Sequence, residues 1–315
     1  MGWRGTLRSV GAAVRAAERD AQRRHKAALK EQMISDAADA VDSWENYIDE
    51  LLTVHVNLAD EIDWNAIANT PKPSEPVRKN DSEAKAKLES YKPSFMDKMF
   101  GQAEKKRVRL QDILAGAPEK DDETYRKAMA NYEAALAEWK ADTELAHKLV
   151  AGEADAIRQV IEEFQSLSKE SLIGSALNFR MSEGRIHAVV QVHTDEIIPS
   201  FRRKQLASGK LSESKMPVGQ FNELYQDYVC SVALKVAGDL FRILPQTEVF
   251  VTCESEMLDT ATGHKKPTPV LSVQFVQETF MRLNLESIDP SDSMSNFNHN
   301  MRFAKTKGFA PIEPL

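Results

Sequence analysis

The sequence has few of the features that mark secreted and membrane proteins. Its 315 residues include two cysteines, Cys230 and Cys253, which are too few for a disulfide framework and suit a reducing compartment. No run of about 18 apolar residues is present, so we expect no membrane-spanning helix. The first residues lack the compact apolar core of a secretory signal. We therefore expect a cytoplasmic, bacterial protein without membrane association, whose cysteines are small buried hydrophobic residues.

Motifs of common catalytic chemistry are also lacking. The chain contains no G-x-x-x-x-G-K-[ST], G-x-G-x-x-G or G-x-S-x-G pattern, so phosphate-binding loops and serine-hydrolase elbows have no support. Its histidines are scattered, without an H-x-x-x-H or C-x-x-C pair, and we expect no zinc site and no cofactor. A formal net charge of -7 argues against attraction of the whole surface to nucleic acid, although local basic patches are compatible with it.

What the sequence has in abundance is charge and helical periodicity. Charged residues make up 28% and hydrophobic residues 42%, a composition typical of globular or coiled-coil proteins. Apolar side chains recur at alternating four- and three-residue steps within residues 1–69 and again within 125–164. This heptad pattern requires a partner helix. We expect one helix over 1–69, interrupted at most once, and a second long helix over the later stretch.

A proline-rich connector separates the two periodic stretches. Residues 70–78 contain three prolines, at positions 71, 73 and 76, and a helix cannot continue through them. Short helices are expected near 81–90 and 95–115, with Gly116, Ala117 and Pro118 ending the latter. We expect the second long helix to fold back on the first, so that residues 1–170 form an antiparallel helical hairpin, a coiled-coil-like stalk.

Charge and apolar periodicity together define the expected partner surface of this stalk. Residues 1–32 hold eight Lys or Arg, whereas residues 33–70 hold nine Asp or Glu and no Lys or Arg. Such blocks favour antiparallel or head-to-tail pairing of helices. The candidate interface consists of the heptad positions Val41, Trp44, Ile48, Leu51, Tyr132, Leu136 and Trp139.

From Ser175 onward the apolar period changes from helical to two. Alternation over 177–192 around a glycine predicts a β-hairpin. A second, more polar hairpin is expected over 201–216 around Gly209, and a broad apolar stripe over 220–244 predicts a helix that lies across a sheet. Strands are expected over 248–257 and 270–276.

The last predicted element is a helix over 291–303, with Asp289 as N-cap and Pro290 in the first turn. The resulting order ββαββα predicts an α+β domain over residues 171–315. We expect an antiparallel or mixed sheet with helices on one face.

Three acidic and basic residues of this domain have a spacing that matches one catalytic class. Asp195 is followed by Glu213 and Lys215, which matches the loose D…E-x-K spacing of restriction-endonuclease-like nucleases. In such sites two carboxylates hold Mg²⁺ and the lysine helps to activate water. Glu-x-Lys also occurs by chance in a highly charged chain, and a solvated loop explains the same residues. Mg²⁺ is implied only if the nuclease hypothesis holds.

Basic residues also gather on the second hairpin, at Arg202, Arg203, Lys204 and Lys210. Such a hairpin can contact phosphates without base readout, but lysines on edge strands also simply discourage aggregation. The interpretation that composition and periodicity favour is a non-catalytic scaffold or adaptor. It would assemble with itself or with partner proteins through its helical part. The alternatives are the nuclease and an accessory factor that binds nucleic acid through the basic hairpin.

Overall fold

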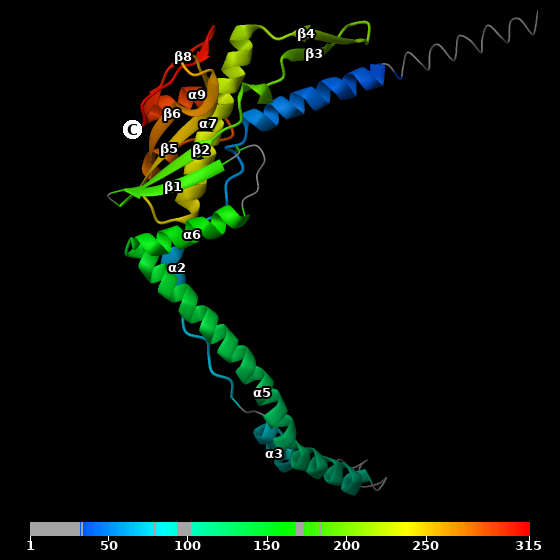
Figure 1. Cartoon of the computed structure of the whole chain (residues 1–315). Helices are drawn as coiled ribbons and strands as arrows, with labels where there is room; N and C mark the ends of the chain where they lie inside the picture. Colours follow the sequence, from blue (N-terminus) through cyan, green and yellow to red (C-terminus); the bar gives the residue numbers. More distant parts are fainter. Residues whose placement is uncertain are drawn as a thin grey trace, which may run out of the picture. The chain divides into compact units, whose positions relative to one another are not determined.

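A computed structural model of the chain describes residues 32, 34–77, 80–92, 102–167, 173–174, 176–182 and 184–315 (Figure 1). The basic stretch 1–31 and the expected start of a helix at 95 lie outside the described residues. The structure mixes helix and sheet, with long helices in the first half and a sheet domain in the second. At this level the expected α+β class is confirmed. No helix within the described ranges combines the length and apolarity that crossing a membrane requires.

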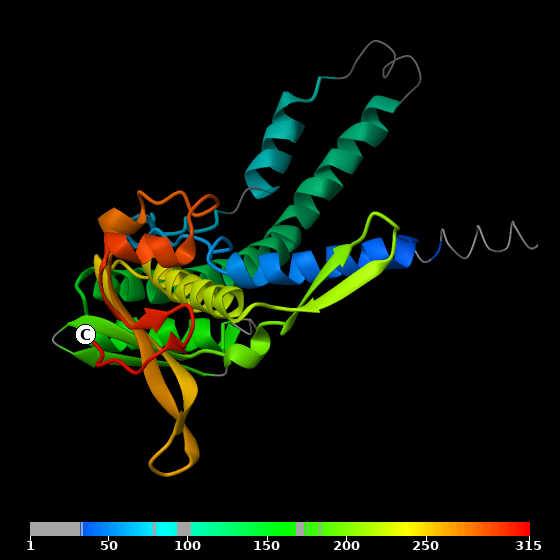
Figure 2. The same ribbon diagram turned by 90° about the horizontal axis from the view of Figure 1, so that it is seen from above.

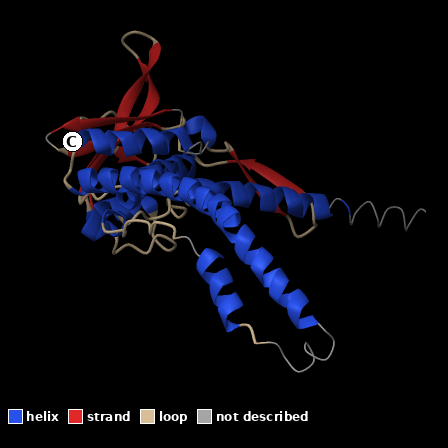
Figure 3. Ribbon diagram, turned by 90° about the horizontal axis from the view of Figure 1, so that it is seen from below, coloured by secondary structure: helices blue, strands red, loops and turns tan. Residues whose placement is uncertain are grey.

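The chain divides into two compact units, residues 63–157 and residues 1–62 together with 158–315. In the first unit, α2 (Trp64–Ala68) precedes an irregular connector and is followed by α3 (Asn80–Ser90) and α5 (Gln102–Val150). The side chain of Asp63 caps α2 by accepting a hydrogen bond from the amide of Ala66 at 2.9 Å. α3 packs beside α5, as Figure 3 shows. The connector is non-helical over residues 70–77, as its prolines predict.

α5 is a continuous helix of 49 residues that contains Pro118. The expected helix end at Gly116, Ala117 and Pro118 is therefore wrong. A proline inside a helix removes one hydrogen bond and costs about 3 kcal/mol. The helix nevertheless continues through Pro118 to Val150.

In the second unit, the helix that the structure describes from residue 34 runs only to residue 52. The expected continuation to residue 69 is wrong, because the chain turns at 53–56 and then packs against α7 (Val218–Ile243). Leu51 and His55 are buried there. The His55 ring contacts the Ser231 hydroxyl at 2.8 Å through Nδ1 and the Leu285 carbonyl at 2.9 Å through Nε2. Burial lowers the pKa of His55.

A buried ion pair on α7 holds the irregular segment that follows. Lys235 and Asp239 lie 3.2 Å apart with side chains 4% and 3% exposed. The ammonium of Lys235 donates to the carbonyl of Asn57, and Asp239 accepts from the amide of Ala59 at 2.8 Å. Arg242 donates to the carbonyl of Ala59 at 3.0 Å. Charged side chains of α7 therefore bond backbone groups of Asn57 and Ala59, in a segment that forms no regular strand or helix.

The core of this unit is a five-stranded sheet in the order β1-β2-β5-β6-β7. β1 and β2 form the expected antiparallel hairpin, β2 pairs in parallel with β5, and the remaining neighbours are antiparallel. The strands are β1 (Ala176–Ser182), β2 (Arg185–Gln191), β5 (Glu248–Asp259), β6 (His264–Val276) and β7 (Asn298–Met301). The parallel pair requires a crossover, which α7 provides by lying across the sheet (Figure 1).

α7 confirms the helix expected over 220–244, but it is buried more completely than an amphipathic stripe predicts. Every residue from Tyr228 to Phe241 is buried. β5 and β6 contact one side of α7, while residues 53–62 and the short helix α9 (Pro290–Ser293) contact other sides. A helix covered from several directions needs few polar positions, and the polar residues that α7 retains in its middle are those of the Lys235–Asp239 pair and Ser231.

The C-terminal segment departs from the expected helix over 291–303. Asp289 does cap α9 by accepting from the amide of Asp292 at 2.9 Å, with Pro290 in the first turn. After one further turn, η2 (Met294–Asn296), the chain becomes β7 and pairs with β6. Asparagine has low helix propensity, and the open edge of β6 offers this amide-rich run backbone partners. Further described elements are α6 (Ala154–Leu167), α8 (Gln277–Phe280), β8 (Phe303–Ala304) and β9 (Gly308–Phe309).

The polar hairpin is confirmed as β3 (Phe201–Gln205) and β4 (Leu211–Lys215), joined at Gly209 with φ 79°. It forms a separate two-stranded sheet. Figure 2 shows it beside the helix of residues 34–52. Trp44 Nε1 donates to the carbonyl of Phe201 at 3.1 Å, and Gln205 Nε2 donates to that of Ile34 at 2.7 Å. These bonds fix the hairpin along the helix.

Candidate functional site

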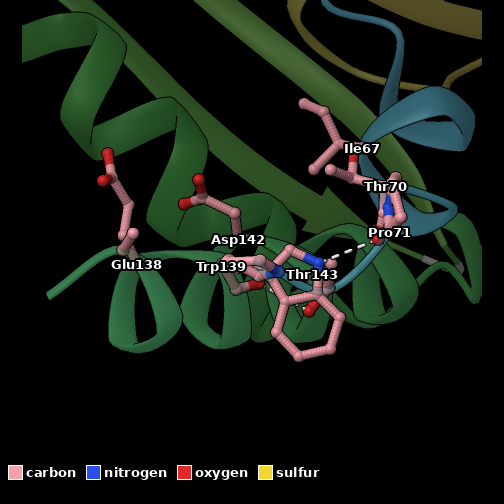
Figure 4. Close-up of a pocket in the computed structure, with 9 residues that line it drawn as sticks. Ile67, Thr70, Pro71, Glu138, Trp139, Asp142 and Thr143 are labelled. Carbon is pink, nitrogen blue, oxygen red and sulfur yellow. Dashed lines mark hydrogen bonds between the residues drawn. The ribbon is translucent and has the colours of Figure 1, made fainter. Parts of the chain in front are cut away.

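A groove of about 280 Å³ opens on the residue 63–157 unit, between the proline-rich connector and α5 (Figure 4). We call it the Trp139 groove. One wall is the connector and the residue of α2 next to it, and the other is a single face of α5. The lining residues are Ile67, Thr70, Pro71, Pro73, Ala135, Glu138, Trp139, Asp142 and Thr143.

The indole of Trp139 is the largest group in the groove, and it is half-buried. Its Nε1 donates to the carbonyl of Thr70 at 2.8 Å (Figure 4). The Thr143 hydroxyl, one turn later on α5, donates to the carbonyl of Trp139 at 2.7 Å. The prolines keep the connector out of helical conformation, so the carbonyl of Thr70 has no helical partner from residue 74 and can accept from the indole. The ring is thereby held in one orientation while part of its surface faces solvent.

Two carboxylates also line the groove. Glu138 and Asp142 are exposed, stand four residues apart on α5, and point to the same side of the helix in Figure 4. Neither forms an ion pair with a basic residue anywhere in the described part of the chain, whereas Glu123 pairs with Lys127 at 2.8 Å on the same helix. Like charges at this spacing destabilise a helix slightly. The groove therefore presents uncompensated negative charge beside an aromatic surface.

A second pair on α5 shows what compensation looks like on this helix. Lys148 lies 2.7 Å from Glu144, one turn away. Its hydrogen bond holds the pKa of the Glu144 carboxyl below the ordinary value. Glu144 lies just beyond the groove and is not part of its lining. Other acidic residues of α5, such as Glu133, form no ion pair with a described basic residue either, and what distinguishes Glu138 and Asp142 is that both line the groove.

The predicted interface residues fall into the two compact units. Tyr132, Leu136 and Trp139 are all half-buried on α5, and Trp139 lies in the groove. Val41, Trp44, Ile48 and Leu51 belong to the helix of residues 34–52 in the other unit, where Leu51 is fully buried. Pairing between these two sets stays a prediction.

The nuclease residues do not come from one continuous sheet. Asp195 is exposed in the short helix η1 (Asp195–Ile197) that follows β2, while Glu213 and Lys215 are on β4 of the separate hairpin. Glu213 accepts from Arg203 Nε at 3.1 Å across the hairpin. No group of three or more His, Cys, Asp or Glu side chains suited to a metal ion occurs among the described residues. The nuclease hypothesis stays a prediction, and Glu213 already has a cationic partner.

The basic hairpin lies next to opposite charge. Arg203 pairs with Glu213 and places its guanidinium 4.9 Å from the centre of the Phe201 ring. Arg202 bonds Gln220, and Lys204 and Lys210 are exposed. The adjoining helix of residues 34–52 contains six acidic residues and no Lys or Arg. Because these carboxylates repel phosphate over several ångströms, they weaken the case for nucleic acid at the hairpin.

Sequence reasoning placed Trp139 on an interface but missed Glu138, Asp142 and the connector wall. The available signal was the occurrence of two acids four residues apart with no base one turn away from either. The groove itself depends on a contact between residues 70 and 139 that no local pattern reveals. Comparisons with protein-family models, curated proteins and solved structures found no match to this chain.

Proposed function

We propose that the protein is a non-catalytic cytoplasmic adaptor, which assembles with itself or with partner proteins through its helical part. The observation that carries the proposal is the Trp139 groove, in which a half-buried indole is held by the Thr70 carbonyl at 2.8 Å beside unpaired carboxylates. Tryptophan is among the residues most enriched at the energetic centres of protein interfaces. A ring that is already fixed loses little conformational entropy on binding.

The lining of the groove supports binding rather than catalysis. Among the described residues that line it, the hydroxyls belong to Thr70 and Thr143, and the latter donates within α5 to the Trp139 carbonyl. These described lining residues include no histidine, cysteine or lysine, so neither hydroxyl stands beside such a base that could activate it. The carboxylates are solvent-exposed and lack the burial that tunes catalytic acids. The chemistry of these residues is that of recognition.

The surface around the groove extends the proposed interface along α5. Leu136 and Tyr132 lie one and two turns before Trp139, respectively, and both are half-buried. A partner segment laid along α5 would cover these side chains together with the indole. Helix faces of this kind bind partner segments through anchors spaced three or four residues apart.

Site-specific photocrosslinking tests the proposal. A photoreactive benzoylphenylalanine in place of Ala135, which lines the groove, should crosslink full-length protein either to a second copy or to a partner protein. When the crosslinked partner has been identified and purified, mixing it with the protein should give a complex whose mass, measured by light scattering, exceeds that of either protein alone. Trp139→Ala should abolish both the crosslink and this increase in mass. A matched variant with the photoreactive residue at exposed position 112 should not crosslink. The proposal fails if position 135 crosslinks no protein, or if Trp139→Ala leaves the crosslink unchanged.

A further inference from the structure

We infer that the Trp139 groove recognises a positively charged side chain, lysine or arginine, on a segment of a partner protein. The inference rests on the proposed function, because it names the chemistry of the partner that the groove would bind. Three properties of the groove lead to it: its unpaired charge, its aromatic and apolar walls, and its size.

The charge of the groove selects against anions. Glu138 and Asp142 are exposed, and no Lys or Arg of the described chain lies within ion-pair distance of either. The basic residues nearest in sequence, Lys72 and Lys140, do not line the groove. A cation between the two carboxylates would remove the repulsion that they exert on each other across one helical turn. Phosphate or an acidic peptide would increase that repulsion.

The walls of the groove match the rest of a basic side chain. The face of an indole attracts a Lys or Arg cation, more strongly than the ring of Tyr or Phe does. Ala135, Pro71 and Pro73 add apolar surface for the methylene groups of the same side chain. Lysine and arginine characteristically bury their stems against apolar surface while the charged end meets polar groups. The combination of one Trp, apolar walls and two carboxylates therefore suits a basic side chain better than a purely apolar one.

The size of the groove fits one inserted side chain. Its volume of about 280 Å³ lies just below the roughly 300–1,000 Å³ typical of small-molecule pockets. One wall is the extended connector, so a partner backbone can lie along the opening while a single residue enters. Arginine would bind more tightly than lysine, since its planar guanidinium can stack on the indole and bond a carboxylate with two donors.

Fluorescence anisotropy with labelled peptides tests this inference on the full-length protein. The probes are four repeats of Arg-Gly, Lys-Gly, Ser-Gly or Glu-Gly, measured at low ionic strength because exposed charge pairs are screened by salt. We expect binding of the arginine peptide, weaker binding of the lysine peptide, and none of the others. Glu138→Gln/Asp142→Asn should weaken arginine-peptide binding on the order of tenfold, as the loss of two exposed ion pairs predicts.

A matched control separates the groove from general attraction to an acidic protein. Glu104→Gln/Asp112→Asn removes the same charge from exposed positions on the same helix, away from the groove. It should change arginine-peptide affinity less than twofold. In addition, the ¹⁹F resonance of 5-fluorotryptophan at position 139, assigned with Trp139→Phe, should shift when the arginine peptide is added. All these substitutions are at exposed or half-buried side chains, and thermal unfolding verifies that each variant is folded.

The outcomes distinguish this inference from the proposed function. If the arginine peptide does not bind, or if both double variants weaken it equally, charge recognition by the groove is refuted. If the photocrosslinked partner then still requires Trp139, the adaptor proposal stands without it. If position 135 crosslinks no protein, the adaptor proposal fails even where the peptide binds.

Discussion

Replacing Asp239 by alanine should destabilise the sheet-containing unit strongly. The variant removes the carboxylate that lies 3.2 Å from the ammonium of Lys235, whose side chain is only 4% exposed. It also removes the acceptor that the amide of Ala59 bonds at 2.8 Å. Breaking a buried ion pair from one side costs about 3–5 kcal/mol. That is a large fraction of the roughly 5–15 kcal/mol that stabilises a typical domain.

Urea unfolding followed by circular dichroism measures this loss, and hydrogen exchange locates it. The amides of Ala59 and Ile62, which bond Asp239 and the carbonyl of Arg242, should exchange faster in the variant. Glu223→Ala is the matched control. Glu223 lies on α7, as Asp239 does, but its ion pair with Lys305 is at the surface. It should cost about 1 kcal/mol or less. A loss of under 1 kcal/mol for Asp239→Ala, or unchanged exchange at Ala59, would refute the role assigned to the pair.

Three further predictions concern pH, helix stability and the nuclease hypothesis. Burial raises the pKa of Asp227 to about 6, above its ordinary 3.8. The stability that the protonated carboxyl contributes is therefore fully present below pH 3.8 and is lost as the pH rises through 6. Asp227→Asn, which cannot ionise, should therefore raise the free energy of unfolding in urea at pH 8 by about 1 kcal/mol, a figure reduced for solvent screening of this partly exposed group. Near pH 4 the same substitution should stabilise the protein by less. Pro118→Ala should raise the thermal stability of α5 followed by circular dichroism, because proline inside a helix costs about 3 kcal/mol relative to alanine, and an unchanged or lower midpoint would contradict this. Plasmid DNA should stay intact with the protein and Mg²⁺, whereas cleavage that Glu213→Ala abolishes would favour a nuclease site made of Asp195, Glu213 and Lys215 over the adaptor.

Elements with local determinants were predictable from the sequence. Both hairpins are predicted by alternation and a glycine at the turn, and α7 is predicted by its long apolar stripe. The N-cap at Asp289 was also correct, because capping needs only residues within one turn. The helix that follows it failed, since the pairing of β7 with β6 is a tertiary contact.

The helical periodicity before residue 69 identified buried positions but not what buries them. Leu51 and His55 stand at heptad spacing, yet the chain between 53 and 62 is irregular and packs on α7. A three- and four-residue repeat is satisfied equally by a partner helix and by a domain core. Charged residues on α7, such as Asp239, are what allow a non-helical segment there, and they lie about 180 positions later in the sequence.

The candidate site was predictable only in part for the same reason. Trp139 stood out as an aromatic residue on a periodic helix face. Its orientation depends on the carbonyl of Thr70, which is 69 positions away. Unpaired carboxylates are detectable from the local sequence of α5, but a groove beside them is not.

The parallel pairing of β2 with β5 has a consequence for synthesis on the ribosome. Residues 192–247 separate the two strands, and all of them must be translated before β5, the parallel partner of β2, is made. Until then the nascent chain carries a completed hairpin in which the edge of β2 that later pairs with β5 is exposed, and an α7 whose apolar surface has no β5 or β6 to cover it. Such intermediates aggregate readily, so the yield of folded protein in a cell depends on how quickly the last seventy or so residues emerge.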